Sequence, residues 1–135
     1  MQKQPNSRHC FVCGIQNGKG LHISFYQDGE GRVVAQLTAG QEYQGYPGVL
    51  HGGIISALLD ETIGRVLVQR DLWAMTAELK VRFLRPVPLE QPITVIGEMV
   101  RLRSRTLEGK GEVRLADGTL AASAGYIIGM GADHI

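Results

Sequence analysis

One stretch of the chain, residues 51–70, has the pattern of a long helix, and the sequence around it has the pattern of strands. Its apolar positions recur at spacings of three and four residues, which places them on one helix face: Ile54, Ile55, Leu58, Leu59, Thr62 and Val66. No proline interrupts the stretch. We therefore expect one central helix whose apolar face is covered by a sheet.

The rest of the chain predicts that sheet. Residues 21–25 alternate apolar and polar side chains, a turn sequence follows at 28–31, and residues 32–37 form the returning strand of a hairpin. Beyond a glycine-bearing loop at 38–50 and the helix, short turns separate four more strand candidates: 75–84, 93–103, 108–115 and 119–128. Consecutive strands with tight turns are mostly antiparallel. The expected order is β-β-α-β-β-β-β, an α+β class.

Length and composition indicate one globular domain. The chain has 135 residues, 44% of them hydrophobic and 20% charged, and we expect a single domain over 1–135 with a polar lead-in at 1–20. The formal net charge of +1 gives no overall field to attract nucleic acid or an anionic membrane. No apolar run approaches the ~20 residues of a membrane-spanning helix, and the polar start lacks a secretory signal. We expect a cytoplasmic protein.

Two cysteines, Cys10 and Cys13, form a C-x-x-C pair in the lead-in. In a reducing cytosol we expect free thiols. A structural zinc site needs about four ligands, so His9 or His22 would have to join the pair. A redox role would need a strand-to-helix turn, and the glycine-rich residues that follow predict a loop. We expect no metal and no cofactor.

The helix face opposite the apolar one is made of small residues around one carboxylate: Gly53, Ser56, Ala57, Asp60 and Gly64. An exposed helix face normally carries long polar side chains, so we expect a second subunit to cover this one. The alternative is an ordinary exposed helix. A carboxylate is costly to bury unpaired, which makes Asp60 a candidate base or nucleophile. The alternative is a surface aspartate that pairs with Arg65.

The start of the helix carries His51, Gly52 and Gly53. The first N–H groups of a helix lack intrahelical partners, and two glycines let a ligand carbonyl come close, as in an oxyanion hole. The alternative is a simple turn into the helix. Asp60 lies nine residues after His51, ~13 Å along an ideal helix and half a turn around it. If both groups serve one reaction, they come from different chains, which predicts a dimer.

These motifs together resemble the hotdog-fold thioesterase superfamily, in the branch of the phenylacetyl-CoA-type and thioesterase-superfamily-member enzymes. Residues 43–53, YQGYPGVLHGG, precede Leu59-Asp60-Glu61, and residues 76–88, TAELKVRFLRPVP, match the strand after the helix. The CFVCG sequence at 10–14 with Gly20-Leu21 resembles the lead-in of many bacterial members. The likeness runs from about Cys10 to Met130, and the combination is specific.

The resemblance implies a six-stranded antiparallel sheet wrapped around one helix, and a dimer with a continuous sheet, often paired again into a tetramer. Asp60 sits where the family has its catalytic carboxylate. Gly52 matches the N–H donor to the thioester oxygen, with Gly53 beside it. His51 matches the histidine that supports the helix start, and Thr76 matches a hydroxyl that orients water in some members.

Two positions complicate this assignment. Several members have an asparagine six residues before the helix histidine, and this chain has Gly45 there. The adjacent Gln44 is a possible substitute. Glu61 directly follows Asp60 and is an alternative working carboxylate, but it lies ~100° around the helix, nearer the core. We therefore prefer Asp60.

The expected function is hydrolysis of acyl-CoA thioesters to a free acid and CoA. The Gly52 N–H of one subunit polarises the carbonyl, and Asp60 of the partner subunit acts as general base or nucleophile. CoA phosphates need cationic partners, and the candidates are Arg82, Arg85, Arg101, Arg103 and Arg105. Their alternative role is a solvated strand face.

Other functions on the same fold remain open. A non-catalytic acyl-CoA-binding protein is the main one. A transcription regulator would carry a DNA-binding appendage, and a dehydratase uses a different His/Asp arrangement. The sequence leaves several acyl groups possible: aromatic, medium-chain and hydroxylated.

Overall fold

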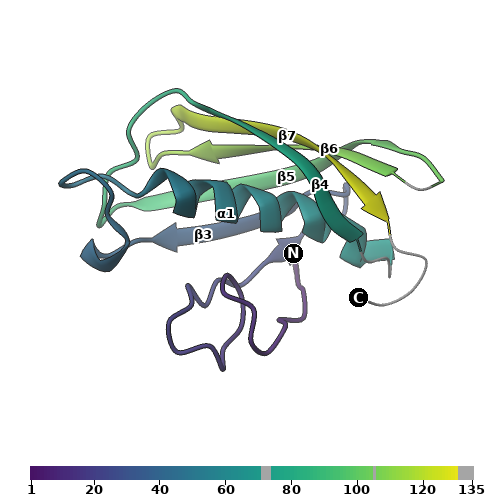
Figure 1. The fold of residues 1–135 in the computed structure, drawn as a ribbon, viewed down its shortest axis with the longest axis horizontal. Helices are drawn as coiled ribbons and strands as arrows, with labels where there is room; N and C mark the ends of the chain where they lie inside the picture. The colour runs from purple at the N-terminus through teal and green to yellow at the C-terminus, as the bar shows by residue number, and fades with distance from the viewer. Residues whose placement is uncertain (71–73, 105, 131–135) are drawn as a thin grey trace.

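The computed structural model describes residues 1–70, 74–104 and 106–130. Helix α1 (Gly52–Gly64) is continued by a 3₁₀ helix, η2 (Arg65–Arg70), and a short 3₁₀ turn, η1 (Gln41–Tyr43), precedes it. The strands are β1 (Gln2–Lys3), β2 (Tyr26–Gln27), β3 (Val33–Thr38), β4 (Ala74–Phe83), β5 (Pro92–Leu102), β6 (Thr106–Arg114) and β7 (Leu120–Met130). Figure 1 shows α1 lying lengthwise along the sheet. The expected α+β hotdog architecture is confirmed.

The sheet of the described residues has seven strands rather than six. Its order is β1-β2-β3-β5-β6-β7-β4, and every pairing is antiparallel. The additional strand is β1, whose two residues pair with β2. Two residues carry no periodicity that a sequence pattern can detect, so this strand was not predictable.

The first expected strand, residues 21–25, is wrong. Leu21, Ile23 and Phe25 are buried as the alternation predicted, but their backbone does not join the sheet ladder. The N–H groups of Leu21 and Ile23 donate to carbonyls of Phe11 and Val12 in the lead-in. His22 between them has φ +55°, which no extended strand adopts. The hairpin strand is β2, one residue further along.

Helix α1 packs closely on the sheet because glycines on β5 and β6 leave room for it. Its buried residues are Ile55, Leu58, Leu59, Thr62 and Ile63. A Cβ at Gly97 would lie 2.7 Å from the Thr62 carbonyl oxygen, and one at Gly111 would lie 3.0 Å from Ile63. A third glycine, Gly109, faces Ile63 in the same way. We call these three residues the glycine seat.

The small face of α1 is only partly covered by this sheet. Gly53 is exposed, and Ser56, Ala57, Asp60 and Gly64 are only partly buried. Within the described part of the chain, no helix is both long and apolar enough to cross a membrane. The cytoplasmic location stays a prediction.

Candidate functional site

The start of α1 leaves one backbone donor without an acceptor. His51 is the N-cap, in an extended conformation, and its Nδ1 accepts from the Gly53 N–H at 2.8 Å. The N–H groups of Ile54 and Ile55 donate to the His51 carbonyl. Among the described residues, the Gly52 N–H takes part in no hydrogen bond. Of the two candidate glycines, Gly52 is therefore the one with a free donor, and His51 orders the turn around it.

Gly45, which stands where several family members have an asparagine, lies against His51. A Cβ at Gly45 would lie 3.2 Å from the His51 Cα and 3.6 Å from its Cδ2. The neighbouring Gln44 directs its side chain elsewhere, since its Oε1 accepts from the Gly48 N–H at 3.2 Å. Gly48 has φ +82°, so this contact closes a tight loop. The alternative that Gln44 substitutes for the asparagine gains no support from this geometry.

Asp60 and Thr76 are brought together although they lie 16 residues apart. The Thr76 hydroxyl donates to Asp60 Oδ1 at 2.5 Å. Asp60 is half-buried on the small face of α1, and Thr76 is exposed near the start of β4. The pairing of β4 with β7 has an irregularity between Thr76 and Glu78. A charge-assisted hydrogen bond of this length holds the carboxylate in one orientation.

Glu61, the alternative carboxylate, points in another direction. Its Oε2 accepts from Arg65 Nε at 3.0 Å, and its Oε1 faces the Cys10 thiol at 3.4 Å. Arg65 therefore pairs with Glu61. The Arg65 guanidinium is buried, donates to the Pro5 carbonyl at 2.7 Å and lies over the Phe25 ring. These contacts fix the lead-in against the end of α1.

The two cysteines, Cys10 and Cys13, form no disulfide with each other. Cys13 is fully buried, and burial raises the pKa of its thiol to about 11, with the neighbouring Glu61 carboxylate acting in the same direction. Arg65 Nη2 donates to the Cys13 sulfur at 2.8 Å. The thiols thus meet the last turn of α1 at Glu61, directly after Asp60, and its C-cap at Arg65.

Sequence reasoning missed Phe83, at the end of β4. A Cβ at Gly52 would lie 3.4 Å from Phe83 Cε1, so the ring borders the free N–H of the helix start. The ring is 56% exposed. Only the fold places this aromatic residue there, because nothing in the sequence relates it to Gly52. On another side of the helix start, a hollow of about 460 Å³ is lined by Lys19, Tyr43 and His51 among others.

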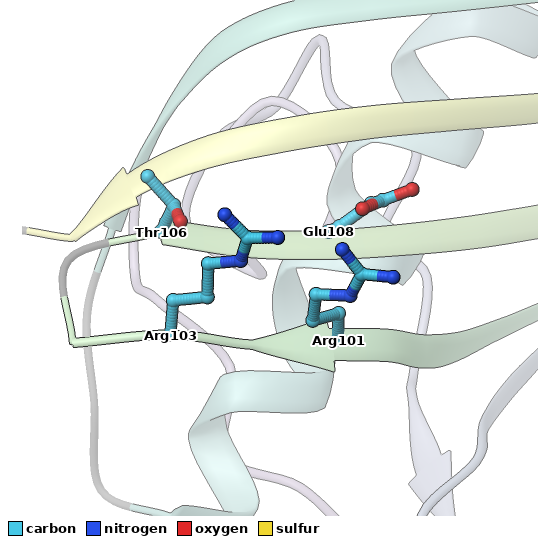
Figure 2. A pocket seen from close by; sticks show the side chains of 4 residues that line it. All are labelled: Arg101, Arg103, Thr106 and Glu108. Carbon is cyan, nitrogen blue, oxygen red and sulfur yellow. The ribbon is translucent and has the colours of Figure 1, made fainter.

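The candidate CoA-binding arginines do not form one group. Arg101 and Arg103 line a hollow of about 170 Å³ together with Thr106 and Glu108, and Figure 2 shows both guanidinium groups extending toward β6, that of Arg101 from the end of β5 and that of Arg103 from the loop just past it. Along β6, the buried Leu107 lies between Thr106 and Glu108. Because neighbouring residues of a strand point to opposite faces of the sheet, the hollow lies on the face away from α1. Arg105 lies outside the described residues.

The other two arginines lie at the opposite end of the sheet. Arg82 is next to Phe83, and the Arg85 N–H donates to the Ala121 carbonyl. Both side chains are exposed. In a single chain, Arg82 and Arg85 are therefore close to the helix start, whereas Arg101 and Arg103 are at the end of the sheet that carries Thr76.

Comparison with known proteins identifies the family. Residues 47–122 match the model of the thioesterase superfamily, which is more than half of the chain and includes α1 and β4. The chain belongs to the thioesterase superfamily. A putative esterase of Saccharolobus solfataricus is 36% identical over 108 residues, covering 78% of this chain and 76% of that protein.

Longer thioesterase relatives are also similar. The acyl-coenzyme A thioesterase THEM4 of Mus musculus is 30% identical over 107 residues, 78% of this chain and 46% of that protein. The chain thus spans about half the length of the THEM4 proteins it matches.

Solved thioesterase structures share the fold. A thioesterase superfamily protein has a TM-score of 0.85 and 32% identity, covering 90% of this chain and 63% of its own. The PaaI protein of E. coli, from the phenylacetic acid degradation operon, has a TM-score of 0.79 at 19% identity, covering 85% and 83%. At that identity the likeness concerns the fold alone.

Proposed function

We propose that this thioesterase-superfamily chain hydrolyses acyl-CoA thioesters to a free acid and CoA, at sites that two chains build together. Family membership and the similarity to acyl-coenzyme A thioesterases support the reaction class. Structural neighbours from Streptococcus pneumoniae and Streptococcus mutans were solved with coenzyme A and with acetyl-CoA. The acyl group is left open.

The observation that carries the proposal is the position of β4. This strand is last in the sheet order, so one of its sides lacks a neighbouring strand among the described residues. Near its start, Thr76 contacts Asp60, and at its end Phe83 borders Gly52. A single strand therefore runs past both halves of the candidate site, which lie about 12 Å apart on α1.

Antiparallel pairing of β4 with its copy would bring the halves together. Such pairing sets the end of one strand beside the start of the other, so Gly52 of one chain approaches Asp60 of its partner. Exposed unpaired strands are a liability that proteins cover, and β4 exposes Met75 by 64% and Phe83 by 56%. The small face of α1 would be covered by the same contact. The family resemblance implies that two such dimers pair again into a tetramer.

In this arrangement each group has a distinct task. The thioester oxygen accepts from the Gly52 N–H, where the positive end of the helix dipole stabilises developing negative charge. Asp60 of the other chain removes a proton from water as it attacks the carbonyl carbon, or attacks directly to form a mixed anhydride that water then cleaves. The C–S bond breaks and CoA leaves as a thiolate, which takes up the proton that Asp60 removed from water or, on the anhydride route, a proton from solvent. The Thr76 hydroxyl orients the carboxylate.

Two mutant structures of the S. pneumoniae protein support this choice of residues. One has an aspartate replaced by alanine and the other a threonine replaced by alanine, at positions 16 residues apart. Asp60 and Thr76 have the same separation. Glu61 lacks a comparable partner on β4, since it faces Cys10 and Arg65.

The proposal is tested by the Asp60→Asn variant, measured on a panel of acyl-CoAs with a thiol reagent that reports released CoA. We expect a fall in kcat of at least ~100-fold, because an amide cannot act as base or nucleophile. Glu61→Gln is the matched control and should keep most of the activity if the fold is intact by circular dichroism. Activity of Asp60→Asn near that of the unchanged chain would contradict the assignment.

The same panel separates the alternative function. A non-catalytic acyl-CoA-binding protein would bind several acyl-CoAs without releasing CoA from any of them. For CoA recognition, Arg82 and Arg85 are the candidates nearest the helix start, whereas antiparallel pairing would bring Arg101 and Arg103 of the partner to the same end of the sheet but on the face away from α1. Replacing a phosphate-binding arginine should raise KM with little change in kcat.

A further inference from the structure

A cluster of possible metal ligands lies where the lead-in meets α1. One ligand atom from each of Cys10, Cys13 and Glu61 lies within 4.8 Å of the others. Cys13 is fully buried, and the Glu61 side chain is only 22% exposed. The proposed thioesterase reaction uses none of the three. We propose that Cys10, Cys13 and Glu61 bind a zinc ion that fastens the lead-in to the helix.

The separations fit a tetrahedral zinc ion. With Zn–S near 2.3 Å and Zn–O near 2.0 Å, a sulfur and an oxygen ligand lie about 3.5 Å apart. Cys10 Sγ and Glu61 Oε1 are 3.4 Å apart. Two sulfur ligands of one zinc ion would lie about 3.8 Å apart by the same geometry. The Cys10 and Cys13 sulfurs lie within 4.8 Å of each other, which is compatible with this separation. The partly exposed Cys10 leaves the fourth position open to water.

The surrounding donors are arranged as they are around metal-bound thiolates. Cys13 Sγ accepts from the Ser7 N–H at 3.4 Å and from Arg65 Nη2 at 2.8 Å. Arg65 Nε also holds Glu61 Oε2 at 3.0 Å, which leaves Oε1 directed at Cys10. Such outer contacts fix the orientation of ligands and tune their affinity.

The charges also balance. Two thiolates and one carboxylate carry three negative charges, and a zinc ion with the Arg65 guanidinium carries three positive charges. A buried cluster is stable only when its charges are compensated in this way. Binding replaces the two thiol protons, which pass to solvent, and no electron transfer is involved.

The turn that begins at Cys10 and includes Cys13 requires a glycine at its end, Gly14. The Gly14 N–H donates to the Cys10 carbonyl at 2.8 Å, and a Cβ at Gly14 would lie 2.5 Å from the Cys10 nitrogen and 2.6 Å from its carbonyl oxygen. This tight turn directs both sulfurs to Glu61. The histidines that the sequence suggested as further ligands lie elsewhere, since His9 is exposed and His22 Nε2 contacts the Asn17 carbonyl.

The test measures metal in the full chain. We express it in zinc-supplemented medium, purify it without chelator and determine zinc by mass spectrometry, expecting about one ion per chain. Replacement of zinc by Co²⁺ should give a thiolate-to-cobalt charge-transfer band. A chelator should speed maleimide labelling of Cys10 and Cys13 in the unchanged chain, a readout that needs no variant.

Matched variants assign the ligands. The Cys10→Ser and Cys13→Ser variants should lose the cobalt band, and Glu61→Gln should weaken zinc affinity at least ~10-fold. Glu98→Gln is the control, because Glu98 is a carboxylate paired with Lys110 at another place. Zinc-free protein whose thiols react equally fast with and without chelator would overturn the proposal. So would a Cys10–Cys13 disulfide, detected as a mass lower by two hydrogens.

Discussion

Gly52 is the residue at which the backbone itself is proposed to act. It follows the N-cap His51, so it is the first residue of α1, and its contribution is an N–H rather than a side chain. Proline is tolerated at this position, because its fixed φ suits the first helical turn and the missing N–H costs no intrahelical bond. His51 already has the extended conformation that a residue before proline prefers.

The Gly52→Pro variant should therefore remove the donor while leaving the helix in place. We expect kcat to fall ~100- to 1,000-fold, the usual cost of losing one oxyanion donor, with an unchanged circular dichroism spectrum. Gly52→Ala keeps the N–H, and its Cβ would be at ordinary contact distance, 3.4 Å from Phe83. Comparable kcat values in the two variants would show that this N–H takes no part in the reaction.

The helix periodicity was enough to distinguish Asp60 from Glu61, because a 100° step separates neighbours on a helix. It could not show what each carboxylate contacts. Glu61 and Cys10 are 51 residues apart in sequence, and Phe83 reaches Gly52 only through the course of β4. Such contacts depend on long-range packing and have no local pattern, which is why the aromatic neighbour and the thiol cluster were not predicted.

At the scale of elements, the turn between β2 and β3 depends on Asp28. Its Oδ1 accepts from the N–H groups of Glu30 and Arg32, and its Oδ2 accepts from Arg32 Nε. The Arg32 backbone N–H, then the Arg32 side chain, lowers the pKa of this partly buried carboxyl. A depressed pKa in the folded state stabilises the fold above the unfolded pKa, and that contribution is lost as pH falls through the folded pKa.

An NMR titration of the Asp28 carboxyl should accordingly give a midpoint below 3.8, the value of an ordinary aspartate. Asp28→Asn keeps an acceptor oxygen and removes the titration, so this variant should lose less stability than the unchanged chain when pH falls through that range. A midpoint at or above the ordinary value would mean that the turn contacts are absent in solution.

The glycine seat decides how closely α1 lies on the sheet. Gly97→Ala would put a methyl group 2.7 Å from the Thr62 carbonyl oxygen, and neither backbone can move away easily. We expect a loss of about 1–3 kcal/mol in the free energy of unfolding, measured by urea denaturation. Gly29→Ala is the control, since its Cβ would meet nothing within 4 Å. Equal stability of the two variants would show that the helix is seated more loosely.

The long elements were predictable and the short ones were not. The four strands after the helix were placed within two residues of their bounds, and the helix expected over 51–70 spans α1 and the 3₁₀ helix η2 that continues it, because each of these stretches carries a periodicity over many residues. Residues 21–25 had the correct burial pattern but hydrogen-bond to the lead-in instead of the sheet. Periodicity reports which side chains are buried, and the hydrogen-bond partners of a backbone are set by the whole fold.

At the scale of the whole molecule, the proposed site requires two chains, and this has a direct test. Equal amounts of Asp60→Asn and Gly52→Pro chains are mixed under conditions that allow subunits to exchange. Each mixed dimer should hold one intact site, made of Gly52 from one chain and Asp60 from the other, and one site with both lesions. Random exchange should give the mixture about a quarter of the activity of the unchanged dimer, measured as CoA release.

A site built within one chain would behave differently. The mixture would then show only the average of the two residual activities, because every chain carries one lesion. Sedimentation of the unchanged chain should in parallel give the mass of a dimer or a tetramer. A monomer that keeps full activity on dilution would contradict the shared site.

The glycine seat has a consequence for how two such sites behave together. In the proposed dimer each α1 serves both sites, giving its first N–H to one and its carboxylate to the other. A helix that moved along its axis toward the substrate in one site would move away from the substrate in the other site. Backbone contacts at Gly97, Gly109 and Gly111 oppose that movement. Both sites can then be complete at the same moment, and substrate saturation should follow a simple hyperbola without cooperativity.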